Sequence, residues 1–347
     1  MDSSALLSAS PVLRGRIPFR PLGRFPTRVH RVDGVAPPSV ELWVKRDDES
    51  GTEYGGNKVR KLEFLLAEAA ARGTSTVCTL GGFGSHHVLA TGLYGARCGL
   101  SVEAVVFPQP ITEHVRETLL ADAACGLRLR AAASFADVPL RLAAARASGV
   151  RLIAAGGSSP IGTLGYVSAA FELAAQQRAG ESPPFDAIYV SLGSCGTAAG
   201  LWLGLGAAGL ATRVVAVRVV DRIVCNRGAT TRLARATARL LSRRGATLPA
   251  PEKQLLEIDH RFYGGGYGVA SDEARAAVEE AARAGLALEP TYTGKAFAAL
   301  LADARAGLLD GKRVLFWHTF SSADLAPLLA RSPGPGALPA RLARLFD

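Results

Sequence analysis

One stretch gathers three cations at the point where a helix is expected to begin. It reads Tyr54-Gly55-Gly56-Asn57-Lys58-Val59-Arg60-Lys61-Leu62-Glu63. Apolar residues recur beyond it at the i, i+3, i+4, i+7 spacing of an amphipathic helix, which predicts a helix over 58–72. The first turn of a helix carries positive partial charge and disfavours cations. Either the side chains of Lys58, Arg60 and Lys61 project into solvent, or an anion such as phosphate lies at this turn.

Three glycine-rich turns, at 81–85, 156–160 and 193–197, each follow an apolar run and open a helical pattern. Ligands of open α/β sheets gather at this edge, where glycine lets the backbone approach an anion. The best candidate phosphate cradle adds two hydroxyls and reads Gly193-Ser194-Cys195-Gly196-Thr197. A tight turn with Ser and Thr helix caps explains these residues equally well.

Other chemical templates fit poorly. The glycines after residue 192 do not form G-x-G-x-x-G, and the chain lacks G-x-x-x-x-G-K-[ST] and G-x-S-x-G, so nicotinamide, nucleotide triphosphate and hydrolase sites are disfavoured. His86 and His87 are adjacent, which places their side chains about 100° apart on a helix. We therefore expect no metal site.

A lysine at one strand end and a phosphate cradle at another suggest a different cofactor. Pyridoxal phosphate needs a lysine for its Schiff base, a cup for its phosphate and a partner for its ring nitrogen. The turn Glu289-Pro290-Thr291-Tyr292-Thr293-Gly294-Lys295 could supply that partner. Thr293 stands where a helix N-cap is expected, and capping alone accounts for it as well.

Several segments together resemble one enzyme family. Residues 55–63 resemble the cofactor-lysine motif of the 1-aminocyclopropane-1-carboxylate deaminase and D-cysteine desulfhydrase family. Residues 157–166, 193–200, 266–269 and 290–296 are similar to its later motifs, in the right order, within a resemblance that covers about 40–320. The resemblance implies a pyridoxal-phosphate enzyme with a two-domain fold of the tryptophan-synthase-β type, called fold type II.

The resemblance also implies roles for individual residues. Lys58 would bind the cofactor covalently, Lys61 would contact its phosphate together with Thr197 and the turn amides, and Ser85 would lie beside the lysine as an acid/base group. The substrate would be faced by Tyr267 and Tyr292. Arg60, which lies between the two lysines on another face of the helix, is expected to be solvated.

Position 293 faces the pyridine nitrogen in this family, with Glu in deaminases and Thr in desulfhydrases. The chain has Thr293, and a hydroxyl stabilises a pyridinium far less than a carboxylate does. The resemblance therefore favours β-elimination from a small amino acid, giving a keto acid and ammonia. Ring opening of the deaminase kind and β-replacement in secondary metabolism remain alternatives.

Two residues depart from the family pattern near the expected ring. His86 replaces an Asn that bonds the cofactor's phenolic oxygen, and its charge state would make activity depend on pH. Phe320 follows His318-Thr319 where the family has glycine, and would intrude on the cofactor region. These departures leave open a cofactor-binding relative that has lost turnover.

The overall composition limits which partners and which cellular compartment can be expected. The chain has 347 residues, 48% hydrophobic, and a net charge of +10 whose basic residues are scattered, so we expect no nucleic-acid partner. Its five cysteines contain no C-x-x-C, and the N-terminus does not resemble a secretory signal, which favours a reducing cytoplasmic compartment. The uncharged run 187–212 contains six glycines and reads as a strand and a helix rather than a membrane span.

Apolar strands alternate with helices almost throughout, which predicts an α/β protein with parallel sheets covered on both faces. We expect a large cofactor-binding domain of residues 1–60 and 170–347, with a small domain of residues 61–169 inserted in it and the active site in the cleft between them. The N-terminal 40 residues are expected to form an irregular arm and the tail from Ser332 to be peripheral. By analogy with the family, the chain would form a homodimer.

Overall fold

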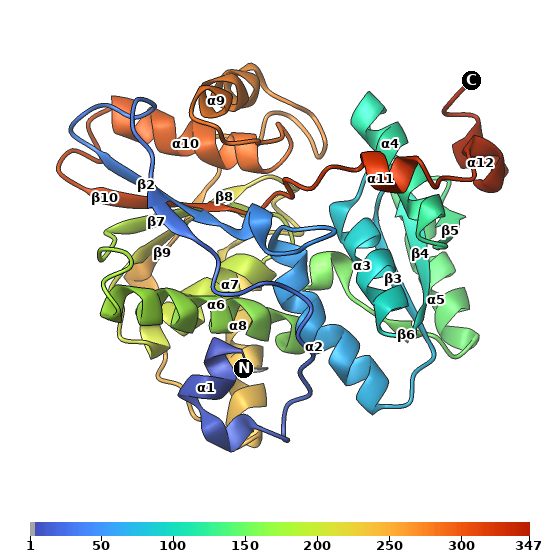
Figure 1. Ribbon diagram of the computed structural model, residues 1–347, viewed down its shortest axis with the longest axis horizontal. Coiled ribbons are helices and arrows are strands. Elements are labelled where there is room, and N and C mark those ends of the chain that lie inside the picture. Colours follow the sequence, from blue (N-terminus) through green and yellow to red (C-terminus); the bar gives the residue numbers. More distant parts are fainter. Residues whose placement is uncertain (1–3) are drawn as a thin grey trace.

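The computed structural model describes residues 4–347, whose strands form two separate sheets (Figure 1). The larger sheet contains, in spatial order, β1 (Val29–Arg31), β2 (Glu41–Arg46), β10 (Arg313–His318), β7 (Ala187–Leu192), β8 (Arg213–Arg218) and β9 (Leu256–Asp259). The smaller sheet contains β5 (Arg128–Ala131), β4 (Ser101–Phe107), β3 (Thr76–Gly82) and β6 (Arg151–Leu152). Neighbouring strands are parallel everywhere except between β1 and β2.

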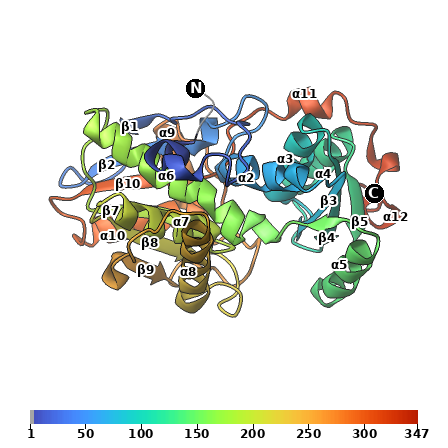
Figure 2. The same ribbon diagram turned by 90° about the horizontal axis from the view of Figure 1, so that it is seen from below.

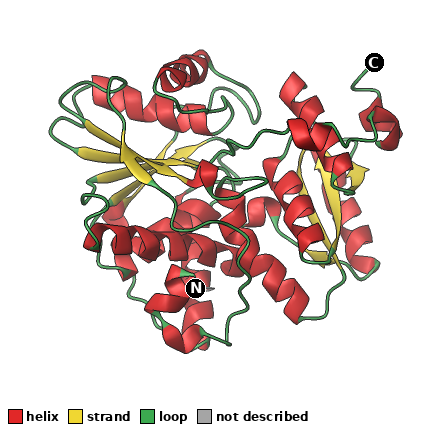
Figure 3. Cartoon of the chain, in the orientation of Figure 1, coloured by secondary structure: helices red, strands yellow, loops and turns green. Residues whose placement is uncertain are grey.

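Helices cover both faces of each sheet, so the strands lie inside layered α/β units (Figure 3). One face of the larger sheet is covered by α1 (Ala5–Ala9), α6 (Pro160–Arg178), α7 (Gly196–Ala207) and α8 (Arg227–Arg243), and the other by α9 (Asp272–Arg283) and α10 (Thr293–Arg305). The smaller sheet packs against α3 (His86–Arg97) and α4 (Glu113–Ala124) on one face and α5 (Val138–Ala147) on the other. Helix α2 (Asn57–Ala71) runs between the two sheets (Figures 1 and 2).

Short 3-10 turns complete the secondary structure, at Pro11–Leu13, Asp47–Glu49, Phe135–Asp137, Ala155–Gly157, Lys253–Leu255 and Pro335–Ala337. The sequence explains the core directly: every residue of β7 is buried, as expected for an apolar strand covered on both faces. Helices α6 and α7 approach closely because two of the four glycines of α7, Gly200 and Gly204, lie against α6. A Cβ at Gly200 would lie 2.5 Å from Tyr166 Cβ, and one at Gly204 2.8 Å from Val167 O.

The α/β class with two parallel sheets is confirmed, whereas the chain ends differ from expectation. The N-terminal arm contains a helix and the edge strand β1, and its residues Leu6 and Leu13 are fully buried. Helix α11 (Ala326–Leu329) precedes the tail from Ser332, which forms α12 (Ala340–Ala343). Leu338 and Leu342 of the tail join the core of the smaller sheet, so the prediction of a peripheral tail was wrong. Strand β9 was also missed, because four residues after a proline-rich segment give too short a pattern.

The uncharged run at 187–212 is accounted for by β7 and α7, as its glycines predicted. Within residues 4–347 we find no helix with the length and hydropathy needed to cross a membrane. The limits 61–169 of the inserted domain stay a prediction, although all strands of the smaller sheet fall inside them.

Candidate active site

Lys58 lies in the first turn of α2, where the chain leaves a glycine turn. Gly56 is the N-cap with φ +86°, and a Cβ there would lie 2.8 Å from Phe320 O, so only glycine fits. The Lys58 amine donates to Asn57 Oδ1 at 2.8 Å, and Asn57 Nδ2 donates to Thr197 Oγ1 at 3.2 Å. These bonds tie the lysine to the turn at 193–197. Burial lowers the pKa of Lys58 to about 8, against a smaller opposing effect of Glu289.

Lys61 is 1% exposed and points at two other glycine-rich turns. Its amine donates to Gly156 O at 3.0 Å and to Ser158 Oγ at 3.4 Å, and forms no ion pair within residues 4–347. Burial and then the charge of Lys58 lower the pKa of Lys61 well below its ordinary value. A buried amine without a carboxylate partner is a costly arrangement that a bound anion would relieve.

The turn at 193–197 faces that amine. Cys195 is the N-cap of α7 with φ +67° and forms no side-chain cap, which leaves the positive end of the helix free for an anion. Ser158 Oγ bonds Ser194 Oγ at 2.8 Å and accepts from Gly196 N at 3.1 Å. A Cβ at Gly196 would lie 2.5 Å from Ser158 Oγ and 3.1 Å from Lys61 Nζ, so a larger residue there would displace the Ser158 hydroxyl.

Cys195 also contacts a second thiol behind the turn. Its Sγ lies 3.1 Å from Cys225 Sγ, and both side chains are buried. Hydrogen bonding from Cys225 lowers the pKa of Cys195.

The predicted substrate-facing tyrosines meet over the same turn. Tyr292 and Tyr267 share a hydrogen bond of 2.8 Å between their hydroxyls, with their rings edge to face. A Cβ at Gly193 would lie 3.2 Å from Tyr292 Cε1. Ser85 is the N-cap of α3, where its Oγ accepts from Val88 N at 3.4 Å. The tyrosines and the turn are therefore brought together, while the contacts of Ser85 are those of a helix cap.

Thr293 is fully buried at the start of α10, where its hydroxyl bonds Glu289 Oε1 at 3.0 Å. Glu289 is a residue that the sequence analysis did not assign. Its carboxylate accepts from the backbone N–H groups of Thr291, Tyr292 and Thr293 at 2.7–3.0 Å. Burial raises the pKa of Glu289, whose charge acts on Lys58. An acidic residue just before a proline and a helix start is the signal that could have identified it.

His86 does not stand alone at the start of α3. Its ring lies roughly parallel to those of Tyr54 and His114, at interplanar angles of 19° and 27°, and meets both edge to edge through its two nitrogens. Phe320 packs edge-on against it with a centroid distance of 4.9 Å. Burial, then the charges of His114 and Lys58, lower the pKa of His86 well below its ordinary value. The two departures from the family pattern therefore contact each other.

The expected solvation of Arg60 was wrong. The side chain is 2% exposed and binds two buried carboxylates. Its guanidinium pairs with Asp47 at 2.7 Å and with Glu172 at 2.8 Å, and Lys45 binds Glu172 at 2.5 Å. These four residues, the Arg60 network, form a charge-balanced cluster that fixes the start of α2, and with it Lys58, against α6 and β2.

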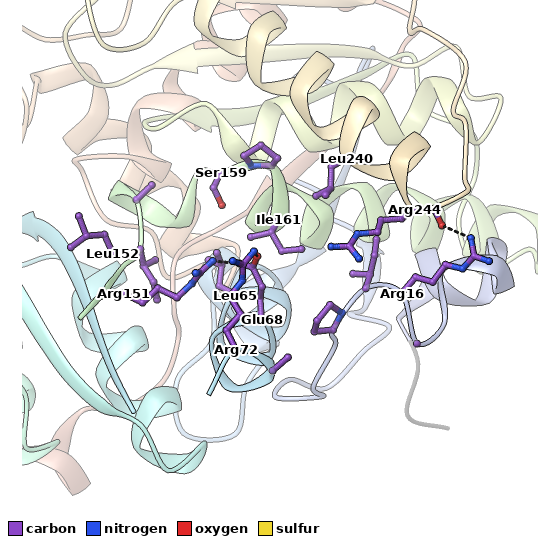
Figure 4. Close-up of a pocket in the computed structure, with 17 residues that line it drawn as sticks. Arg16, Leu65, Glu68, Arg72, Arg151, Leu152, Ser159, Ile161, Leu240 and Arg244 are labelled. Atoms are coloured by element: carbon purple, nitrogen blue, oxygen red, sulfur yellow. Dashed lines mark hydrogen bonds and ion pairs between the residues drawn. The ribbon is translucent and has the colours of Figure 1, made fainter. Parts of the chain in front are cut away.

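A cavity of about 620 Å³ lies elsewhere, between α2, β6, α6, α8 and the N-terminal arm (Figure 4). Arg16, Arg72, Arg151 and Arg244 line it together with Glu68, which Arg72 and Arg151 bind. None of the predicted site residues lines this cavity, so we locate the candidate active site by its side chains instead.

The residues at Lys58 fit pyridoxal phosphate. The unpaired Lys61 amine, the Ser158 and Ser194 hydroxyls and the uncapped start of α7 would hold a phosphate, and Lys58 supplies an amine for covalent attachment. Within residues 4–347, no group of three or more His, Cys, Asp or Glu side chains could hold a metal ion.

Lys61→Met is expected to weaken retention of the cofactor about 10- to 100-fold, because a charge-assisted hydrogen bond contributes about 1.5–3 kcal/mol. Equilibrium dialysis against pyridoxal phosphate measures the change. The cofactor-free variant should be at least as stable as the wild type, since a desolvated amine is removed. Lys312→Met, at an exposed ion pair, is the control. Unchanged affinity in Lys61→Met would place the phosphate elsewhere.

Comparison with known proteins agrees with the cofactor that these residues fit. The family model described as "Pyridoxal-phosphate dependent enzyme" matches residues 21–319. The chain is 36% identical to nocardicin C-9' epimerase of Nocardia uniformis subsp. tsuyamanensis over 92% of this chain and 97% of the relative. It is 32% identical to D-cysteine desulfhydrase of Serratia proteamaculans (strain 568), over 80% and 86%.

A solved structure, described as an ACC deaminase homologue, matches with a TM-score of 0.76 and 31% identity over 95% of this chain and 100% of that one. The resemblance noted in the motifs and the expected fold are thereby confirmed. The chain belongs to the family of pyridoxal-phosphate-dependent enzymes.

Proposed function

We propose that this enzyme takes the α-proton from a small amino acid and expels a substituent from Cβ, which gives a keto acid and ammonia. When bound, pyridoxal phosphate supplies the electron sink for the bond that breaks at Cα. The observation that carries the proposal is Thr293, at the position that faces the pyridine nitrogen in the family. Its hydroxyl is already bonded to Glu289. A hydroxyl favours little positive charge on the ring, so early departure of a β-substituent suits this site better than ring opening.

The chain's own groups divide the work as follows. Lys58, with a pKa lowered to about 8, is partly neutral near physiological pH and can take the α-proton once the substrate has displaced it. Asn57 orients that amine. Ser85, at the start of the adjacent helix, is the alternative proton carrier. The hydroxyl pair of Tyr267 and Tyr292, which lies close to Gly193, would face the substrate.

Epimerisation at Cα is the second candidate, and two observations favour it. The imidazoles of His86 and His114 contact each other, and the charge of Lys58 acts on His86. These imidazoles offer a second proton carrier besides the lysine. One relative that matches nearly the whole chain is named nocardicin C-9' epimerase. Inversion requires a proton to leave one face of Cα and another to arrive on the opposite face, so a second carrier is what distinguishes it from elimination.

An amino-acid panel in deuterium oxide separates the two functions. The panel contains D- and L-cysteine, D- and L-serine, 1-aminocyclopropane-1-carboxylate and longer D- and L-amino acids. Keto acid and ammonia release is the expected result. Inverted product with deuterium at Cα and no keto acid would replace elimination by epimerisation. A product that retains an added thiol would indicate β-replacement instead.

Thr293→Glu is expected to lower the elimination rate at least about tenfold. A carboxylate would stabilise positive charge on the pyridine ring by more than about 1.4 kcal/mol relative to a hydroxyl, whereas the proposed elimination is favoured by a ring that carries little positive charge. Steady-state keto acid release measures the change, and the visible spectrum checks that the cofactor is still bound. Thr293→Ser, which keeps the hydroxyl, is the matched control and should retain most activity. Faster elimination in Thr293→Glu would show that Thr293 does not select the reaction.

We further propose that the enzyme works in the cytoplasm as a homodimer. All five cysteines are free thiols, including the adjacent Cys195 and Cys225, which accords with a reducing compartment. Sedimentation of the purified protein tests the dimer.

A further inference from the structure

Four polar side chains form a line from the buried hydroxyl of Tyr54 to the surface of α4. The Tyr54 hydroxyl bonds His86 Nδ1, and His86 Nε2 lies 3.0 Å from His114 Nε2. The carboxylate of Glu117 lies 3.9 Å from His114 Nδ1. Exposure rises along the line, from 2% for Tyr54 to 40% and 42% for the side chains of His114 and Glu117. The inner end is therefore shielded from solvent and the outer end is solvent-exposed.

The neighbouring groups keep both histidines neutral. Burial, His114 and Lys58 lower the pKa of His86, and burial outweighs Glu117 in lowering that of His114. Burial, with Asp122, Glu289 and Tyr94, raises the pKa of the Tyr54 hydroxyl, which stays protonated.

Neutral rings allow only one hydrogen between the two facing Nε2 atoms, so the line has just two ordered arrangements. In the outward arrangement Tyr54 donates to His86 Nδ1, His86 Nε2–H donates to His114 Nε2, and His114 Nδ1–H faces Glu117. In the inward arrangement each hydrogen is reversed, and a bare His114 Nδ1 faces the carboxylate. Glu117 therefore favours the outward arrangement, because a carboxylate can accept a hydrogen bond but cannot donate one.

The inner end of this line lies within electrostatic reach of the candidate active site. The charge of Lys58 acts on His86, and that of Glu289 acts on the Tyr54 hydroxyl. Phe320 seals the side of the His86 ring, and its backbone packs against Gly56. Tyr54 is held in turn, because Tyr94 donates to its carbonyl oxygen. The rings are thus fixed between the lysine turn and α4.

We propose that Tyr54, His86, His114 and Glu117 form a proton path that connects the Lys58 site to solvent. Each hop breaks one O–H or N–H bond and forms one on the next acceptor: Tyr54 passes its proton to His86 Nδ1, His86 passes its Nε2 proton to His114, and His114 passes its Nδ1 proton to Glu117 or water. Tyr54 is restored by the proton that the site releases, so no charge accumulates. The same line run in reverse delivers a proton inward.

The path deepens the proposed function, because both elimination and epimerisation require a proton to enter or leave the closed site. It assigns His86 and His114 as proton carriers that act through Tyr54. The path also explains why His86 replaces the family's Asn, since an imidazole can pass a proton from one nitrogen to the other and an amide cannot.

Nitrogen-15 NMR of histidine-labelled, cofactor-free protein tests the path without any turnover. The expected result is protonation of His86 at Nε2 and of His114 at Nδ1, with both rings neutral at pH 7.5. Two protonated rings at that pH, or hydrogens on both facing nitrogens, would overturn the path. This measurement stands even if no amino acid is turned over, so its failure and that of the proposed function are distinguishable.

Chemical rescue tests the path in the working holoenzyme. His114→Ala should lower turnover about 10- to 100-fold, at the low end of the loss typical for a removed proton carrier, while KM stays unchanged. Added imidazole should restore the rate, because His114 is partly exposed and leaves an open position. His260→Ala, at a histidine outside the line, is the control and should show neither effect. A rate loss that imidazole cannot restore would reduce His114 to a structural role and overturn the path.

Discussion

Lys58→Ala is expected to lose covalent cofactor binding and at least about a thousandfold in turnover, since the lysine both anchors the cofactor and moves the α-proton. The Lys58 amine is buried and, within residues 4–347, is hydrogen-bonded only to Asn57 Oδ1, so alanine removes the reactive group while leaving the ion-paired part of α2 intact. The visible absorption spectrum and single-turnover rates measure the two losses.

Lys58→Arg is the matched comparison, because it keeps a cation in the same turn of α2. It should bind pyridoxal phosphate through the 193–197 turn but fail to form a bond that borohydride can reduce. If Lys58→Ala kept a band that borohydride abolishes, another lysine would be the anchor. Lys61 and Lys295, which are also buried, would then be examined.

Arg60→Met is expected to lower the free energy of unfolding by about 3–5 kcal/mol, the usual cost of removing one partner from a buried ion pair. The guanidinium makes hydrogen bonds of 2.7–2.9 Å to Asp47 and Glu172, whose charges would remain buried with only Lys45 to balance them. Chemical denaturation followed by circular dichroism measures the change. Arg28→Met, which removes an exposed pair with Glu49, is the control and should cost less than about 1 kcal/mol.

The same variant should become more sensitive to acid. Burial alone would raise the pKa of Glu172, but Arg60 and Lys45 lower it to about 2. A depressed folded-state pKa contributes stability above the unfolded-state value, near 4.5, that is lost as the pH falls toward 2. Arg60→Met should lose this contribution already near neutral pH and unfold at higher pH than the wild type. An unchanged acid midpoint would mean that the Arg60 network does not stabilise the fold.

Local patterns predicted most of the structure because they are written in adjacent residues. The apolar runs of β7 and β10 and the periodicity of α2 each identify an element without reference to the rest of the chain. The glycine turns could be placed at strand ends for the same reason. The short strands β1 and β9 were not predicted, since three or four residues are too few to show a hydrophobic period and their pairing is decided by tertiary contacts.

Contacts between distant residues account for what the sequence did not reveal. Arg60 was expected in solvent because its position was judged from the helix start alone, whereas its partners Asp47 and Glu172 lie 13 and 112 residues away. His86 could be recognised as unusual, but its partners Tyr54 and His114 lie 32 and 28 residues away in separate elements. Charge compensation and hydrogen bonds between distant side chains become visible only once the fold is known.

Peptide mapping after borohydride reduction tests the central claim most directly. The purified holoenzyme is reduced, digested with trypsin and analysed by mass spectrometry for a pyridoxyl group, with Lys45, Lys61 and Lys295 as the competing buried lysines. We predict a single modified peptide, residues 47–60, in which trypsin fails to cleave after Lys58. A pyridoxyl group on another lysine, or none on any peptide, would contradict the assignment of this site.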